Sequence, residues 1–184
     1  MDDFKERCFG CQDCELSKTR NNVVFGEGDP HANVMLIGEA PGKNEDLQGR
    51  PFVGAAGKIL DELLESAGLD RESVFITSIL KCRPPGNRNP TRSEIIACTP
   101  CLNKQIEIIK PKVIGCMGNF AARFIMEKFG LGRGSISSIH GSVYNVSTLY
   151  GVIRIIPLFH PAAALYDRKK IDLLKEDFKM LNGG

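Results

Sequence analysis

Apolar runs and helical patterns alternate along most of the chain. Four short apolar runs, several of them rich in β-branched residues, predict strands covered on both faces at 34–37, 74–80, 113–116 and 152–159. A hairpin is expected near 143–156, leading into the last of these strands. The pattern therefore predicts a sheet built mostly from buried strands.

Helical spacing of apolar residues marks the segments between these strands. The pattern that starts at 54 ends at Gly68, a residue suited to a helix C-cap, and Thr91 with Glu94 has the spacing of a capping box. The expected helices are 54–67, 91–110, 119–129 and 167–181. The segments interpreted as loops include 38–57, the Pro-rich basic stretch 83–90 and the Gly-rich stretch 130–142.

This alternation predicts an α/β fold in which a mainly parallel sheet lies between two layers of helices. With 184 residues and 42% hydrophobic content, the chain is expected to form a single three-layer domain over 1–184. The polar segment 1–20 has no long periodic pattern. It is expected to be loop and short helix, tied to the core by whatever its cysteines bind.

Three unusual loops follow the ends of predicted strands, at 38–42, 78–87 and 160–165. In a parallel sheet such loops meet at the carboxyl edge, where ligands bind. The first loop continues to Glu45 and Phe52, which offer a carboxylate and a ring face to a flat polar ligand. Each loop alone is equally an ordinary tight turn. An acidic loop, a basic Pro-rich loop and a His-Pro loop on one edge together favour a shared site.

Charge and hydropathy set few limits on partners. The chain has 24 basic and 22 acidic side chains and a formal net charge of +2, so contact with a polyanion depends on local clusters of charge. No apolar run reaches the ~20 residues needed to span a bilayer, and the N-terminus lacks the apolar core of a signal peptide. We therefore expect a cytoplasmic protein that does not insert into a membrane.

Seven cysteines, an odd number in a chain expected in a reducing compartment, favour metal or cluster binding over structural disulfides. A bacterial ferredoxin motif is excluded because Lys18 stands where its fourth cysteine belongs. Spacing leaves two ligand sets open. A zinc ribbon would use Cys11, Cys14, Cys98 and Cys101, and an iron–sulfur cluster would use Cys11, Cys14, Cys82 and Cys98. Cys116, inside an apolar strand, is expected to be a buried thiol.

Four stretches of the chain, taken in order, resemble motifs of the family 4 uracil-DNA glycosylases, the iron–sulfur branch of the uracil-DNA glycosylase superfamily found in thermophilic bacteria and archaea. They are 11–20 (CQDCELSKTR), 38–54, 81–90 (KCRPPGNRNP) and 160–163 (HPAA). The resemblance implies a monofunctional DNA repair enzyme that hydrolyses uracil from DNA and leaves an abasic site. It also implies that a 4Fe–4S cluster is bound by Cys11, Cys14, Cys82 and Cys98, which leaves no role for Cys8, Cys101 and Cys116.

The same resemblance implies roles around the pocket. The residues lining the uracil pocket would be Glu39, Ala40, Pro41 and Phe52, with the Phe52 ring stacked on the base. Glu45 and Asn87, with Glu39 as a further carboxylate, would manage the attacking water. His160 would donate to uracil O2, where negative charge develops as the glycosidic bond breaks. Without the motif, Phe52 is equally a core side chain and His160 a structural histidine.

Two positions depart from the family pattern. Ser78 stands where the family usually has an asparagine that pairs with uracil, so discrimination against cytosine is expected to weaken or to use water. Ala40 leaves the loop 38–42 without an aspartate of the kind that activates water in the best-known branch. The alternatives are a related glycosylase with a different base range, motivated by Ser78, a non-catalytic iron–sulfur DNA-binding protein, and a protein with structural zinc.

Because a base inside a duplex cannot reach such a pocket, the nucleotide must flip out. The candidate phosphate contacts are Lys81, Arg83, Arg88, Arg92, Arg168, Lys169 and Lys170. Leu165 is the candidate wedge in the loop after His160. Charge runs of this kind are also common on ordinary solvated surfaces. The expected partners are single- and double-stranded DNA that contains uracil, together with replication or repair proteins, and the protein is expected to be a monomer.

Overall fold

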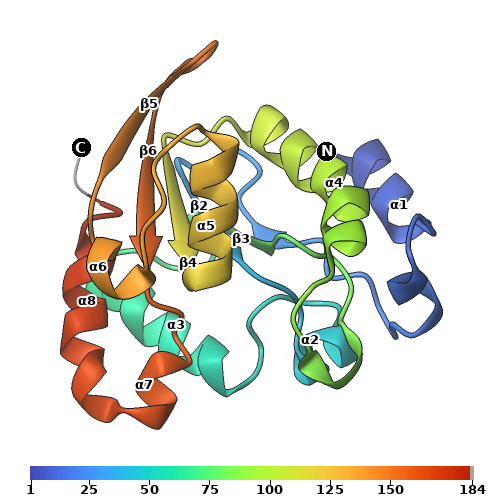
Figure 1. Cartoon of the computed structure of the whole chain (residues 1–184), viewed down its shortest axis with the longest axis horizontal. Coiled ribbons are helices and arrows are strands. Elements are labelled where there is room, and N and C mark those ends of the chain that lie inside the picture. The colour runs from blue at the N-terminus through green and yellow to red at the C-terminus, as the bar shows by residue number, and fades with distance from the viewer. Residues whose placement is uncertain (183–184) are drawn as a thin grey trace.

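A six-stranded mixed sheet runs through the middle of the molecule (Figure 1). The structure is a computed structural model and describes residues 1–182. The strands stand in the order β1-β3-β2-β4-β6-β5, with the bounds β1 (Glu27–Gly28), β2 (Val34–Gly38), β3 (Val74–Ser78), β4 (Val113–Met117), β5 (Tyr144–Thr148) and β6 (Gly151–Leu158). Strands β3, β2, β4 and β6 are parallel, and β1 and β5 pair antiparallel at the two edges. The predicted α/β fold with a mainly parallel sheet is confirmed.

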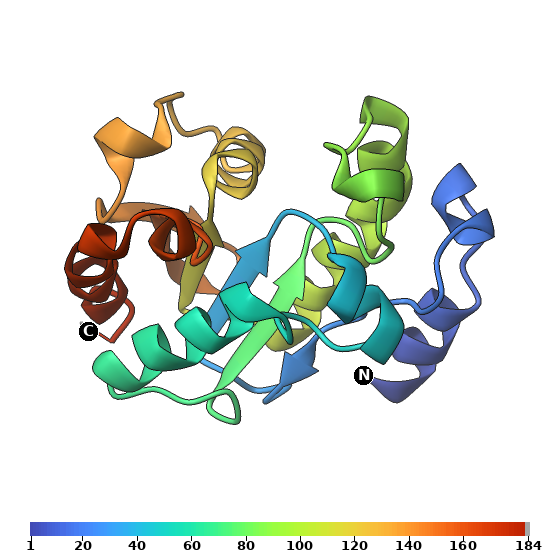
Figure 2. The same ribbon diagram turned by 90° about the horizontal axis from the view of Figure 1, so that it is seen from below.

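Helices cover both faces of this sheet (Figure 2). The α-helices are α1 (Asp2–Phe9), α2 (Lys43–Gln48), α3 (Ala55–Ser66), α4 (Arg92–Ile109), α5 (Asn119–Lys128), α6 (Ile136–Ile139), α7 (Ala163–Tyr166) and α8 (Ile171–Lys179). Short 3₁₀ helices lie at η1 (Glu15–Lys18), η2 (Pro85–Asn87) and η3 (Arg168–Lys170). No helix within residues 1–182 is long and apolar enough to cross a membrane.

Alternating side chains of β2 enter two separate cores. Met35 and Ile37 belong to the core formed with α4 and α5, whereas Leu36 belongs to the core formed with α3 and α8. All three side chains are fully buried. This is the burial on both faces that the continuous apolar runs predicted.

Parallel pairing brings the carboxyl ends of the strands to one edge. Gly38, the last residue of β2, lies opposite Ser78, the last residue of β3. On the other side, Met117 at the end of β4 lies opposite Leu158 at the end of β6. The three loops singled out in the sequence therefore leave the sheet side by side.

The predicted helix boundaries hold where capping chemistry is present. Thr91 Oγ1 accepts a hydrogen bond from the Glu94 amide at the start of α4, and the Glu94 carboxylate accepts one from the Thr91 amide, so the capping box is confirmed. Gly68 has a left-handed φ of 69°, as expected just after the end of α3. The segment 1–20 is short helix and loop, as predicted.

The prediction of loop for all of 38–57 is wrong, because α2 lies inside it. Its sequence, KNEDLQ, has no apolar periodicity, so the pattern gave no signal. The helix is held by a tertiary contact: Asp46 is buried, and its Oδ1 accepts from the Asn21 amide at 2.9 Å. The single-turn helices α6 and α7 were missed for the same reason, since one turn shows no period.

Candidate functional site

A cavity of about 350 Å³ opens at the carboxyl edge of the sheet, between the three loops. It is lined by Val24, Glu39, Ala40, Pro41, Gly42, Glu45, Pro51, Phe52, Ala56, Ser78, Pro84, Asn87, Arg88 and His160. The predicted convergence of the three loops is confirmed. Every residue assigned to the base or to the water by resemblance lies on this cavity.

Phe52 is held in a conformation that few residues adopt. Its φ is 52°, in the left-handed region, and its side chain is buried against the His160 ring, with centroids 5.6 Å apart and planes at 29°. A bulky residue at positive φ costs roughly 1–3 kcal/mol, and such strain is kept where the surroundings enforce it. The protein itself therefore holds the Phe52 side chain in place against His160.

Two residues enforce the Phe52 conformation. Arg71 donates to the Pro51 carbonyl at 3.1 Å and also to the Phe52 carbonyl. Gly57, in the first turn of α3, lies so close that a Cβ there would stand 1.8 Å from the Phe52 carbonyl oxygen. Only glycine fits at position 57.

Glu45, in the first turn of α2, closes the same loop from the inside. Its Oε1 accepts hydrogen bonds from the amides of Val53 at 2.9 Å and Gly54 at 3.0 Å. Its Oε2 lies over Gly42, where an added Cβ would come within 2.7 Å of it. Oε1 is thus hydrogen-bonded to the backbone, whereas Oε2 lies near Gly42 on the cavity wall.

His160 has one tautomer set by its own loop. The Ala162 amide donates to His160 Nδ1 at 3.1 Å, so Nδ1 carries no proton and the neutral ring is protonated at Nε2. Burial lowers the pKa of His160, and the Glu45 carboxylate opposes this only partly. The ring is therefore a neutral hydrogen-bond donor through Nε2.

Glu39 and Ser78 complete the floor of the cavity at the ends of β2 and β3. Burial raises the pKa of the half-buried Glu39 carboxyl. Ser78 is 4% exposed and lines the cavity. An asparagine amide would reach farther and offer a donor and an acceptor together, so Ser78 leaves more room here.

The prediction that Lys81 grips phosphate is wrong. Its side chain is 3% exposed, and its ammonium donates to Ser78 O at 2.6 Å, Thr77 Oγ1 at 2.6 Å and Gln105 Oε1 at 2.7 Å. All three of its donor positions are used inside the protein. The sequence shows only a lysine in a basic stretch, and nothing local indicates that its partners lie on β3 and α4.

The Pro-rich loop carries two of the predicted basic residues: Arg88 lines the cavity, and Arg83 contacts the lining residue Asn87. Arg83 Nε donates to Asn87 Oδ1 at 2.7 Å, which fixes the Asn87 amide and leaves its NH₂ group pointing away from Arg83. Arg88 makes a two-pronged ion pair with Glu94, at 2.9 and 2.6 Å. That pair and the α4 cap lower the Glu94 pKa to about 2, so the carboxylate stays charged.

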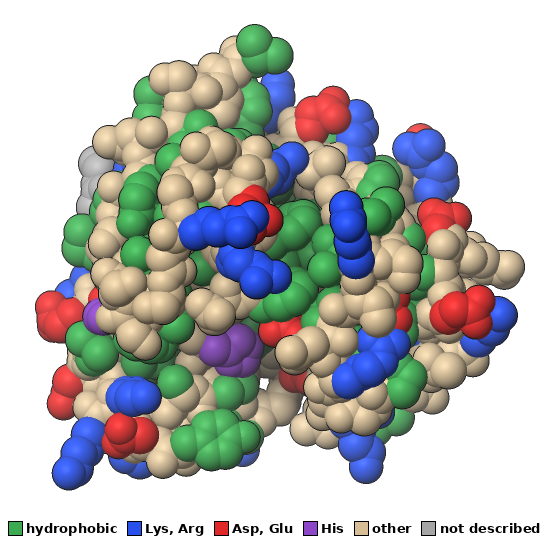
Figure 3. All heavy atoms as spheres, in the orientation of Figure 1, with side chains coloured by type: hydrophobic (Ala, Val, Ile, Leu, Met, Phe, Trp, Pro, Cys, Tyr) green, Lys and Arg blue, Asp and Glu red, His purple; other side chains and the backbone are tan. Residues whose placement is uncertain are grey.

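Further predicted DNA contacts lie on exposed surface. Arg92 and Arg168 are exposed, and Leu165 on α7 is 44% exposed. Tyr166, next to Leu165, is 91% exposed and was not singled out in the sequence. Figure 3 shows Lys and Arg side chains on both sides of a hollow that a histidine side chain borders.

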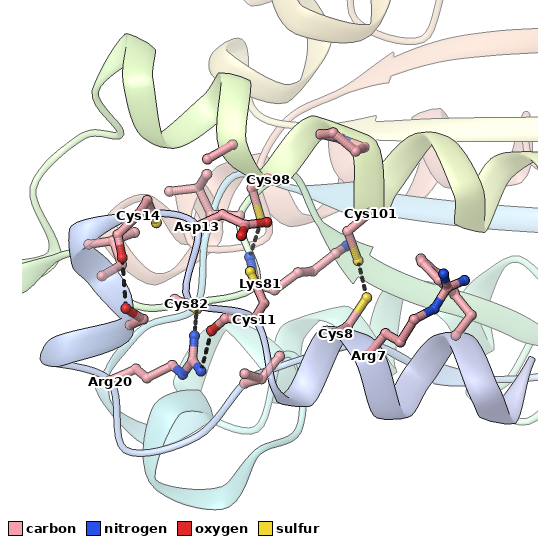
Figure 4. Close-up of a pocket in the computed structure, with 17 residues that line it drawn as sticks. Arg7, Cys8, Cys11, Asp13, Cys14, Arg20, Lys81, Cys82, Cys98 and Cys101 are labelled. Carbon is pink, nitrogen blue, oxygen red and sulfur yellow. Dashed lines mark hydrogen bonds between the residues drawn. The ribbon is translucent and has the colours of Figure 1, made fainter.

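A second cavity, of about 240 Å³, is lined by six of the seven cysteines. They come from the N-terminal segment, the residue after Lys81, and α4: Cys8, Cys11, Cys14, Cys82, Cys98 and Cys101 (Figure 4). Two donors stabilise negative charge on sulfur there, since the Lys81 amide donates to Cys98 Sγ at 3.2 Å and Arg20 donates to Cys82 Sγ at 3.3 Å. The six thiols, the two hydrogen-bond donors and the volume of the cavity fit a cluster of several atoms that is bound by thiolates.

Within residues 1–182, no three His, Cys, Asp or Glu side chains are close enough to bind one metal ion. Cys116 is fully buried in β4, as the sequence predicted. Burial raises the pKa of its thiol.

The structure also adds residues that sequence reasoning missed. Arg71 supports the first cavity and Val24 lines it, both from outside the recognised motifs. Arg71 lies in the turn before β3, far along the chain from Phe52. No local pattern links such positions, because only the folded chain brings them together.

Comparisons with known proteins show the family of this chain. The family described as "Uracil DNA glycosylase superfamily" matches residues 25–182. The chain is 46% identical to the type-4 uracil-DNA glycosylase of Archaeoglobus fulgidus, over 98% of this chain and 91% of that protein. It is 48% identical to the one from Saccharolobus solfataricus, over 92% and 79% of the two chains. Identity to the one from Thermotoga maritima is 43%, over 91% and 84%.

The environment of His160 makes a prediction for its titration. Because burial disfavours the imidazolium, the folded protein should protonate His160 below the ordinary pKa of about 6.5. As the pH falls below about 6.5, the unfolded chain binds a proton at this residue that the folded chain does not. The free energy of unfolding therefore decreases as the pH falls from about 6.5 to the lower pKa of the folded state. A ¹⁵N NMR titration should report a midpoint below 6.5 and a proton on Nε2. A midpoint at or above 6.5, or a proton on Nδ1 at neutral pH, would contradict the assigned geometry.

Proposed function

We propose that this chain, which belongs to the uracil DNA glycosylase superfamily, hydrolyses the N-glycosidic bond of uracil in DNA and leaves an abasic site. One observation supports this most: a partly buried, neutral His160 with its proton on Nε2 stands beside the Phe52 ring on the wall of one cavity. A flat base stacked on Phe52 would bring a carbonyl oxygen to that donor. The type-4 relatives carry the name of this activity.

The reaction makes specific demands on the leaving group. Water adds its oxygen to C1′ of the sugar, the C1′–N1 bond breaks, and uracil leaves with the bonding electrons as an anion spread over N1, O2 and O4. A neutral donor aimed at O2 stabilises that charge more in the transition state than in the substrate. His160 is the donor in this proposal, and Phe52 holds the base in plane.

The attacking water needs an acceptor near the sugar. Glu45 supports this role through its geometry, since Oε1 is held by two amides while Oε2 has no backbone partner among the described residues. Asn87 can donate to the same water through its NH₂ group, because Arg83 occupies its Oδ1. Glu39 is the remaining carboxylate on the cavity, and its raised pKa suits it to hold a proton instead.

DNA binding in this proposal uses the rim of the cavity. Arg83 and Arg88 extend from the Pro-rich loop, with Arg92 and Arg168 on the neighbouring surface. Leu165 and the more exposed Tyr166 stand on α7, directly after the His160 loop, and in this proposal they fill the gap left by a flipped nucleotide. The protein would act as a monomer on single- and double-stranded DNA in the cytoplasm, with replication or repair proteins as further partners.

We further propose that Cys11, Cys14, Cys82 and Cys98 bind a 4Fe–4S cluster in the second cavity. Four thiolates suit such a cluster, and donors from Arg20 and Lys81 point at Cys82 and Cys98. When bound, the cluster supplies a cross-link between the N-terminal segment, the end of β3 and α4. It is structural in this account, because it stands apart from the cavity that holds Phe52 and His160.

A second candidate is a glycosylase of the same superfamily with a different base range. The observation that favours it is Ser78, whose short hydroxyl leaves space and pairing capacity open on the floor of the cavity. Hypoxanthine or xanthine would then be processed faster than uracil.

The proposal predicts uracil release by the purified protein. An oligonucleotide with one uracil should break at that position after incubation and alkali, in both single- and double-stranded form. His160→Ala should lower the single-turnover rate by roughly 10²–10³-fold, the usual cost of one lost donor to a developing oxyanion. The matched control is His31→Ala at an exposed loop position, which should leave the rate unchanged.

Three results distinguish the alternatives. Faster release of hypoxanthine or xanthine than of uracil would favour the second candidate. Binding of DNA without product from any base would refute glycosylase activity altogether. An unchanged rate in His160→Ala would refute the role of His160 while leaving the activity in place.

The cluster proposal predicts loss of stability when iron is removed. Because the cluster ties three segments together, chelation of iron should lower the Tm by more than roughly 10 °C. Cys82→Ala should purify with less iron, whereas Cys116→Ala, which changes a buried thiol outside the second cavity, should keep it. An unchanged Tm after complete removal of iron would mean that the cluster is not structural, and a colourless protein with stoichiometric zinc would exclude the cluster.

A further inference from the structure

We propose that Cys8 and Cys101 form a disulfide bond that fastens helix α1 to helix α4 beside the second cavity. Their sulfur atoms face each other at 2.9 Å (Figure 4). That separation is about 0.9 Å longer than a disulfide bond of ~2.05 Å, so a small adjustment of side-chain torsions would close it. The two residues are 93 positions apart in the chain, so the contact is created by folding and not by local sequence.

The pair is distinct from the proposed cluster ligands. Cys98 Sγ and Cys82 Sγ accept hydrogen bonds from Lys81 and Arg20, whereas the sulfur atoms of Cys8 and Cys101 have each other as hydrogen-bond partner. A 4Fe–4S cluster held by four other cysteines leaves these two without a ligand role. Two thiols this close, with no metal to bind, are suited to oxidation as a pair.

The surroundings of the pair favour formation of the bond. Cys8 is 8% exposed, while Cys101 is partly exposed, and both line the second cavity, through which a small oxidant can reach them. The two sulfur atoms are in hydrogen-bond contact, and this contact lowers the pKa of Cys8, which supplies the attacking thiolate in this proposal.

The oxidant in this proposal is a low-molecular-weight disulfide, RSSR. The Cys8 thiolate attacks one sulfur of RSSR, which forms a mixed disulfide and releases one thiolate. The Cys101 sulfur, after losing its proton to that thiolate, attacks the Cys8 sulfur and releases the second RS⁻, which is protonated from water. Two cysteine sulfurs are each oxidised by one electron, and one RSSR becomes two RSH.

Such a bond would tie helix α1, and the cysteine-bearing segment after it, to the rest of the fold. Helix α1 packs on the core partly through Phe4 and Phe9 against Phe25, with ring centroids at 5.7 and 6.4 Å. It leads directly into Cys11 and Cys14. Closing a loop of this length restricts the unfolded chain strongly, and it would also hold Cys11 and Cys14 near Cys82 and Cys98 when no cluster is bound.

Peptide mapping of the iron-loaded wild-type protein tests the proposal directly. The protein is equilibrated with oxidised glutathione, unfolded without reductant, alkylated with iodoacetamide and digested. We expect one cross-linked peptide pair containing Cys8 and Cys101, lighter by two hydrogen masses than the sum of its parts. Cys116 should be fully alkylated and serves as the internal control.

Two variants separate a disulfide from a ligand role. Cys8→Ser and Cys101→Ser should each keep the iron content and visible absorption of the wild type, yet melt roughly 5–15 °C lower after the oxidised glutathione treatment. The matched control Cys116→Ala should still give the cross-linked pair.

The proposal is overturned if both cysteines are alkylated after oxidised glutathione treatment, or if Cys8→Ser loses iron, which would make Cys8 a cluster ligand. If a variant fails to fold, peptide mapping of the wild-type protein still shows whether Cys8 and Cys101 form a disulfide. None of these readouts involves uracil, so failure here and failure of the proposed function are distinguishable.

Discussion

The parallel pairing of β2 with β3 and β4 is the constraint on which the rest of the structure depends. These strands are buried on both faces, so their backbone groups find no water and must pair with each other in register. In that register Gly38 lies opposite Ser78. Strand β6 pairs in parallel with β4, so the chain leaves the sheet near His160 at the same edge. The cavity exists because these chain reversals share one edge, whatever their individual sequences.

At this edge of the sheet, a few side chains are held in conformations that lower the stability of the protein. Phe52 is held at positive φ by Arg71 and Gly57, and His160 is held in one tautomer by the next turn of its own loop. Lys81 connects the two cavities, because its ammonium binds Ser78 O under the first and its amide binds Cys98 Sγ in the second. A change in structure around the cysteines would therefore affect the floor of the first cavity through Lys81.

The sequence predicted most of the sheet and the longer helices because burial on two faces and helical amphipathicity are local patterns. It also predicted which loops converge, since parallel strands share a carboxyl edge. The prediction was wrong for Lys81 and omitted α2 and Arg71, whose states depend on partners distant in the chain: Gln105 for Lys81, Asn21 for Asp46 of α2, and Pro51 for Arg71. The chemical roles rested on resemblance, because spacing alone left two cysteine sets and an ordinary tight turn open.

The central claim is that the first cavity binds uracil between Phe52 and the donor of His160. The most direct measurement is a crystal structure of the protein with free uracil, the product of the proposed reaction. We expect density for one uracil in this cavity, with its ring parallel to Phe52 and O2 within hydrogen-bond distance of His160 Nε2. An empty cavity at saturating uracil, or a uracil whose O2 points away from His160, would contradict it.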